Sequence, residues 1–170
     1  MDIKRILTDY ESAKRQKDAA EQQKSEAERQ NAEAERMRRQ LNAGRIEKHL
    51  REVVAPVLDD ARTEILAGGY KCSVESVSIR DPMFPASEQM FALRLKLTTG
   101  RDDAKEPAWL EYVGDFDSVT LSRVEKVGTG RAIRIINDIE NPDDRHPLSE
   151  FGADNVGKQV EAFCRAVFEV

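Results

Sequence analysis

Hydrophobic positions in residues 3–41 recur at seven-residue intervals along an otherwise polar segment. One row of this repeat is entirely apolar and is called the heptad row; it consists of Ile6, Ala13, Ala20, Ala27, Ala34 and Leu41. The companion row begins with Ile3 and Tyr10 and is polar afterwards. A seven-residue repeat with polar flanks is typical of a long helix that packs against another helix along a narrow seam. Because no glycine or proline occurs before Gly44, the sequence predicts an unbroken helix up to that residue.

The large apolar side chains of this segment lie at its two ends, and alanine, which buries little area, fills the middle. Two interpretations remain open: a coiled coil with a second copy or with a partner's helix, and a solvated single helix supported by charge pairs. We expect the coiled coil. Its predicted interface consists of Ile3, Ile6, Leu7, Tyr10, Ala13, Ala20, Ala27, Ala34 and Leu41.

After Gly44 the narrow seam gives way to a broad apolar face at helical spacing over residues 46–66, which predicts a buried helix. Pro56 lies inside this helix and predicts a kink near residues 52–55. Two glycines, at 68 and 69, are suited to end it. The change of pattern predicts an extended helical stalk over residues 1–44 and a globular domain over residues 45–170.

The spacing then changes to the alternation of β-strands. Strands are predicted over residues 70–79, 90–98, 108–116, 119–127 and 131–136, with a bulge in the first and a hairpin turn at 128–130. Residues 137–150 predict an acidic loop, and a final helix follows with an apolar face from Val156 to Phe168. Strands that follow one another between helices indicate an α+β fold. We therefore expect a long coiled-coil-like helix, a buried helix, a 4–5-stranded antiparallel sheet and a C-terminal helix packed on one sheet face.

Charge is divided unevenly between the two parts. Residues 1–45 hold 11 basic and 9 acidic residues, a balance of +2, so the rest carries −7 of the total of −5. An acidic globular part makes nucleic acid an unlikely main partner.

No signal peptide or apolar segment of about 20 residues is visible. Two cysteines are too few for a disulfide framework. We expect a cytoplasmic protein without membrane association whose two thiols are buried and free.

One group of side chains on the predicted sheet is a candidate ligand surface. It combines two cationic and two aromatic residues: Arg94, Lys96, Trp109 and Tyr112. Aromatic rings with a polar edge and nearby cations suit binding, although a tryptophan at the start of a strand also serves as core or rim.

A second candidate is a weak set of metal ligands formed by Asp115, Asp117 and His146. Alternate aspartates on a strand point the same way and can share a cation. The competing interpretation is a strand end followed by a turn, where Asp and Ser are common, with His146 in a loop that faces water. We favour the turn, and we expect neither a metal site nor a cofactor. No set of residues predicts a catalytic site.

Residues 53–60, Val-Val-Ala-Pro-Val-Leu-Asp-Asp, follow a long charged helix. This junction resembles that of GrpE-type nucleotide-exchange factors of bacterial chaperones. Those proteins carry a small β-domain at the end of the helix, whereas this chain predicts a larger sheet followed by a helix. The sequence is therefore not assigned to that family.

Taken as a whole, these patterns predict a non-enzymatic interaction or adaptor protein. It would form a homo-oligomer or bind a partner's helix through residues 1–44, and its α+β domain would present a binding surface. The alternative hypothesis is a small-ligand- or metal-dependent enzyme or sensor domain, with the helix setting the oligomeric state.

Overall fold

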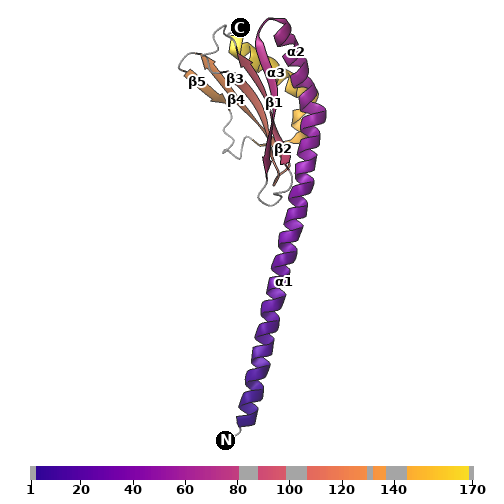
Figure 1. Ribbon diagram of the computed structural model, residues 1–170, viewed down its shortest axis with the longest axis vertical. Coiled ribbons are helices and arrows are strands. Elements are labelled where there is room, and N and C mark those ends of the chain that lie inside the picture. The colour runs from indigo at the N-terminus through magenta and orange to yellow at the C-terminus, as the bar shows by residue number, and fades with distance from the viewer. Residues whose placement is uncertain (1–2, 81–87, 99–106, 130–131, 137–144, 169–170) are drawn as a thin grey trace. The chain divides into compact units, whose positions relative to one another are not determined.

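A computed structural model describes residues 3–80, 88–98, 107–129, 132–136 and 145–168 (Figure 1). The chain divides into two compact units, Met1–Arg38 and Arg39–Val170. The fold is α+β, with a long N-terminal helix, an antiparallel sheet and a C-terminal helix, as the sequence predicts. The division precedes the predicted one after Gly44, because Asn42 and Ala43 are already buried in the second unit.

The first helix, α1 (Ile3–His49), is continuous through Gly44. The helix predicted to be unbroken up to Gly44 thus extends five residues beyond it. Glycine in a helix interior costs only about 1 kcal/mol relative to alanine, and the strong helix formers on the N-terminal side outweigh that cost. In the first unit, every side chain that the structure describes is exposed to solvent.

A π-helical turn, η1 (Leu50–Val54), connects α1 to α2 (Ala55–Ala67). The N–H of Ala55 donates to the carbonyl oxygen of Leu50, five residues earlier. Pro56 follows directly, and proline has no N–H and crowds the preceding turn, so the irregularity predicted at residues 52–55 takes the form of a widened turn. The chain leaves α2 through Gly69, whose φ of 85° suits glycine.

Five strands form an antiparallel meander in the order β1-β2-β3-β4-β5. They are β1 (Lys71–Arg80), β2 (Glu88–Thr98), β3 (Ala108–Asp115), β4 (Thr120–Thr129) and β5 (Ala132–Ile136). The register shifts between Val77 and Ser78, within the strand where a bulge is predicted, but the extra residue is Phe91 of β2, which lies between the paired Met90 and Ala92. A short sixth strand, β6 (His146–Pro147), pairs with the start of β4.

Helices cover one face of this sheet, as Figure 1 shows for α2 and for α3 (Ala153–Phe168). The core lies between the helices and this face of the sheet. Its largest fully buried aliphatic side chains are Ile46, Leu50, Val54, Leu58, Leu95, Leu97, Leu110, Leu121 and Val156. The apolar face predicted for the last helix is confirmed at Val156, Val160 and Phe163, which are all buried.

The end of the predicted loop over residues 137–150 has regular structure. Residues 137–144 lie outside the described residues, but β6 is followed by a 3-10 turn, η3 (Leu148–Phe151). Phe151 is 2% exposed and packs edge-on against Tyr112, with ring centroids 5.8 Å apart. The loop prediction was wrong over residues 146–150 because this aromatic anchor holds the segment against the core.

Across the described ranges, every helix is either too short or too polar to cross a lipid bilayer.

Candidate functional site

The surface of α1 bears exposed apolar side chains near its start and again at Leu41. The exposed fractions are 58% for Ile3, 56% for Leu7, 67% for Tyr10 and 70% for Leu41. Between these ends, the alanines of the heptad row are exposed as well. The side chain of Ile6 lies outside the described residues. Single apolar side chains on a surface are ordinary, but a periodic row of them along a polar helix is typical of an unpartnered packing face.

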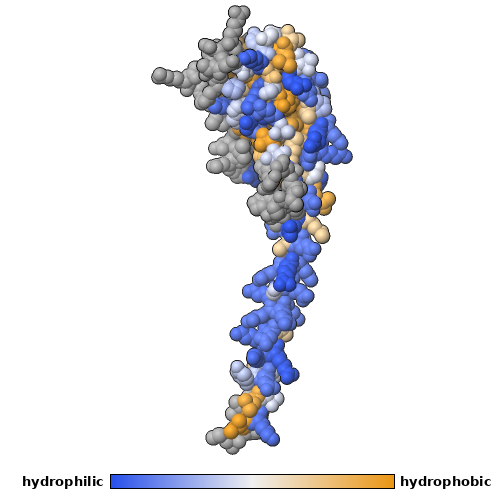
Figure 2. All heavy atoms as spheres, in the orientation of Figure 1, coloured by the Kyte–Doolittle hydropathy of each residue, from blue (hydrophilic) through white to orange (hydrophobic). Residues whose placement is uncertain are grey.

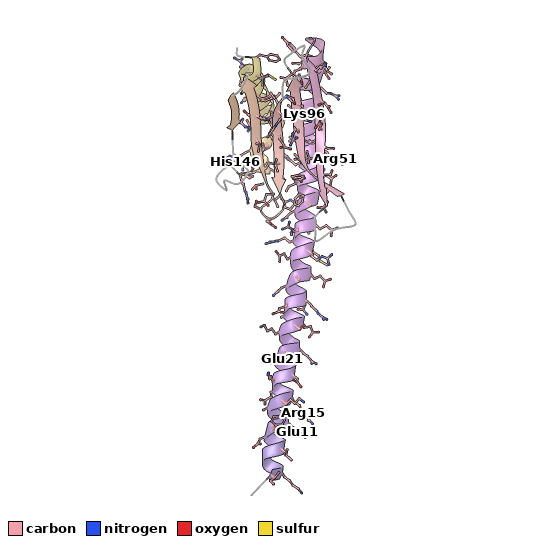
Figure 3. All side chains as sticks on the ribbon, turned by 60° about the vertical axis from the view of Figure 1, so that its left-hand side comes forward. Glu11, Arg15, Glu21, Arg51, Lys96 and His146 are labelled. Carbon is pink, nitrogen blue, oxygen red and sulfur yellow. The ribbon has the colours of Figure 1, made fainter. Side chains whose placement is uncertain are left out.

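Charged side chains flank this row and give the helix its hydrophilic surface (Figure 2). Glu11, Arg15 and Glu21 project away from the helix axis (Figure 3). Of these three, Glu21 directly follows Ala20 of the heptad row, at the flanking position that sets partner and orientation in coiled coils, whereas Glu11 and Arg15 lie farther from the row.

Three of the four residues of the predicted ligand surface lie together on the outer sheet face, the face opposite α2 and α3. The guanidinium of Arg94 lies 4.9 Å from the centre of the Trp109 ring. Its Nη2 donates to Oε1 of Glu111 at 2.9 Å, and Nζ of Lys96 lies 2.8 Å from Oε2 of Glu75. The cations are thus paired within the sheet, so this face is a network of ion pairs around an aromatic ring.

Tyr112 does not belong to that surface, and the prediction that grouped it with Trp109 was wrong. Residues three apart on a strand point to opposite faces, and Tyr112 is fully buried beneath α3. Its hydroxyl donates to Oε1 of Gln159 at 2.9 Å. Burial, the largest influence, raises the pKa of Tyr112, and the nearby Glu125 adds to this rise while Arg123 opposes it.

The structure gives other partners to the side chains predicted as weak metal ligands. Oδ2 of Asp115 accepts from Arg145 at 2.6 Å and from Ser118 at 2.7 Å, and its Oδ1 accepts from the N–H of Asp117. Oδ1 of Asp117 in turn accepts from Arg39 at 2.7 Å. The bonds from Ser118 and from the N–H of Asp117 are those of a turn between β3 and β4, and Arg145 and Arg39 pair with the two carboxylates from distant parts of the chain.

His146 contacts residues other than the two aspartates. Its Nδ1 is 3.0 Å from Oε2 of Glu150, and its ring packs against Phe151. Within the described part of the chain, no group of three or more His, Cys, Asp or Glu side chains is arranged to hold a metal ion.

The structure also shows a polar hollow of about 360 Å³ in the second unit, beside α3 and β4. Its polar lining consists of Arg123, His146, Glu150, Asn155, Lys158 and Gln159, and Phe151 adds an apolar wall. Arg123, Lys158 and Gln159 belong to no motif or spacing in the sequence that predicts a shared site. A signal was present, however: Arg123 and Glu125 occupy the inward positions of β4, between the buried Leu121 and Val127, where apolar residues are expected.

A second hollow, of about 570 Å³, lies between α2 and α3 and is mostly apolar. Val57, Ile65, Val160 and Cys164 line it.

Both cysteines, Cys72 and Cys164, are free, and each is half-buried, so the predicted burial is partial. Burial, and then the neighbouring Cys164, raise the pKa of Cys72 to about 11 despite the opposing charge of Arg62. Burial, followed by the charge of Glu64, also raises the pKa of Cys164.

No protein-family model, no protein of curated function and no solved structure shows significant similarity to this chain.

Proposed function

We propose that this chain is a non-enzymatic assembly protein in which α1 pairs with α1 of a second copy as a coiled coil. The observation that carries this proposal is the exposure of the large apolar side chains that belong to the predicted interface on α1. Ile3, Leu7 and Tyr10 have between 56% and 67% of their surface exposed in a single chain. A second helix packed along the predicted interface would remove these side chains from water.

The two ends of the row supply most of the association free energy. Fully burying one large aliphatic side chain contributes about 1.5–3 kcal/mol, whereas an alanine contributes far less. The alanines of the heptad row instead allow close approach of two helices and fix which face is paired. The pairing is therefore sensitive to any charge that is placed on the row.

The globular unit would be carried on each copy of the paired helix. Its acidic charge would favour partners with basic surfaces and would speed their encounter. A ligand-dependent role of this unit is favoured by one observation, the polar hollow, and is compatible with assembly through α1.

The test compares two double variants of the full chain that carry identical substitutions on different faces of α1. Ala20→Glu with Ala34→Glu places four carboxylates on the paired face of a dimer. Ala19→Glu with Ala32→Glu is the matched control, since both alanines are exposed but lie off the heptad row. Multi-angle light scattering across a concentration series gives the molar mass of each protein.

We expect the parent chain and the control to reach twice the chain mass of 19.2 kDa, and the row variant to remain at that mass. Like charges facing each other across a seam oppose association. A parent chain that stays monomeric at all concentrations would exclude self-pairing. Equal dissociation of both variants would show that added charge, and not the row, controls assembly.

A further inference from the structure

We infer that the polar hollow beside β4 and α3 binds a small organic carboxylate. This inference concerns the globular unit and does not rest on pairing through α1. The hollow brings together side chains from separate elements: Arg123 from β4, His146 from β6, Glu150 and Phe151 from η3, and Lys158 and Gln159 from α3.

Arg123 is the central residue of the site because an ion pair with the buried Glu125 holds its side chain in place. Its Nε lies 3.2 Å from Oε1 of Glu125, a carboxylate only 5% exposed. The side chain of Arg123 is 25% exposed and lines the hollow. Its Nη groups have no bonded partner among the described residues. A guanidinium held along one edge presents its remaining N–H groups as a rigid fork, which matches the geometry of a carboxylate.

Two further donors from α3 border the same space. Oε1 of Gln159 accepts the Tyr112 hydroxyl at 2.9 Å, which assigns the oxygen to the core side and leaves the amide N–H groups for a ligand. Lys158 is exposed, lines the hollow and has no ion pair among the described residues. Guanidinium, ammonium and amide N–H groups are all donors, so the part of the hollow lined by Arg123, Lys158 and Gln159 is suited to acceptor oxygens.

The charges on the wall favour a single negative charge on the ligand. Arg123 and Lys158 contribute two positive charges, and Glu150 on the wall and Glu125 behind Arg123 contribute two negative charges. Because these charges already balance, a dianionic phosphate would meet more repulsion from Glu150 and Glu125 than a carboxylate with a single charge. Phe151 offers an apolar wall for a carbon skeleton, and a volume of about 360 Å³ suits a small molecule.

The experiment titrates the ¹⁵N-labelled full chain with benzoate and follows backbone and side-chain amide shifts by NMR. Benzamide is the neutral probe of nearly the same shape, and inorganic phosphate is the dianionic probe. Two variants test the residues. Arg123→Lys keeps a positive charge beside Glu125 but loses the fork, and Lys158→Gln removes an exposed charge. Lys48→Gln on α1 is the matched control, because Lys48 is exposed and does not line the hollow.

We expect benzoate to shift the amides around Arg123, Lys158 and Gln159 and to bind more tightly than benzamide or phosphate. Arg123→Lys should weaken benzoate binding about tenfold and Lys158→Gln about threefold, as expected for losing charge-assisted hydrogen bonds. Lys48→Gln should leave binding unchanged. The inference is overturned by absence of benzoate binding, by shifts that map elsewhere, by equal binding of benzamide, by tighter binding of phosphate, or by unchanged binding in both site variants.

Discussion

Gly114 of β3 lies directly against the side chain of Ile46 on α1. A Cβ atom at residue 114 would overlap Cγ2 of Ile46 and would come within 3.2 Å of the carbonyl oxygen of Phe91. Ile46 is fully buried at this contact. The absence of a side chain at residue 114 therefore allows the C-terminal part of α1 to pack on the sheet.

Replacing Gly114 with alanine should destabilise the globular unit by about 1–3 kcal/mol, the usual cost of overpacking a core. Chemical denaturation followed by circular dichroism measures this change. Gly157→Ala in α3 is the control, because nothing lies within 4 Å of a Cβ at that position. It should stabilise the protein by about 0.5–1 kcal/mol through helix propensity. Changes of the same sign in both variants would contradict the packing argument.

Asn42 provides a second contact between α1 and the sheet. Its Nδ2 donates to the carbonyl oxygen of Phe116 at 2.7 Å in a buried setting. Asn42→Ala leaves that carbonyl without its partner and should cost about 1–3 kcal/mol. Asn31→Ala, at an exposed position of the same helix, should change stability by less than about 0.7 kcal/mol. Thermal unfolding of both variants gives the comparison, and an equal change in both would show that the hydrogen bond of Asn42 does not contribute to stability.

Two ion pairs on the outer sheet face should differ in strength because they differ in burial. Glu111 is 7% exposed and Arg94 29%, whereas Lys96 and Glu75 are 32% and 43% exposed. Arg94→Gln strands a buried carboxylate and should cost about 3 kcal/mol. Lys96→Gln should cost less than about 1 kcal/mol. Urea unfolding of both variants tests this order, and the reverse order would mean that Glu111 is solvated without Arg94.

The thiol of Cys72 should react slowly near neutral pH, because its pKa is raised from 9.0 to about 11. At pH 8 its thiolate fraction is roughly a hundredfold below that of an ordinary thiol, so iodoacetamide should modify it correspondingly slowly. Labelling should accelerate as pH rises toward 11 and on unfolding in urea. Mass spectrometry of digested protein follows the site, and rapid labelling at pH 8 in the folded protein would contradict the raised pKa.

The same shift has a consequence for stability. A thiol whose pKa is higher in the folded state loses its proton first in the unfolded chain. Stability should therefore be unaffected by this group below pH 9 and should fall as pH rises from 9 to about 11.

The fold was predictable because local patterns are strong where the core is simple. Alternating leucines identified β2, and the spacing of Val156, Val160 and Phe163 identified the buried face of α3. Two predictions were wrong, the placement of Tyr112 and the loop over residues 146–150. Tyr112 was grouped with Trp109 although strand geometry separates residues three apart, and η3 was missed because one aromatic residue anchors it.

The polar hollow could not be predicted from sequence patterns, because its lining residues come from separate elements. Arg123, His146 and Lys158 come together only through the pairing of β4 with β6 and the packing of α3. Residues so far apart in the chain carry no shared spacing. The inward position of Arg123 on β4 was the one local signal, and it marked a polar group in the core without showing its neighbours.

Pairing through α1 is tested most directly by electron spin resonance on the full chain with one nitroxide label at Gln22→Cys and both native cysteines replaced by alanine. Residue 22 is midway between Ile3 and Leu41, so full-length pairing brings two labels together in either helix orientation. With helix axes about 8–10 Å apart, we expect an inter-label distance of roughly 20–35 Å. A sample without dipolar coupling between copies, or with only longer distances, would contradict assembly through this helix.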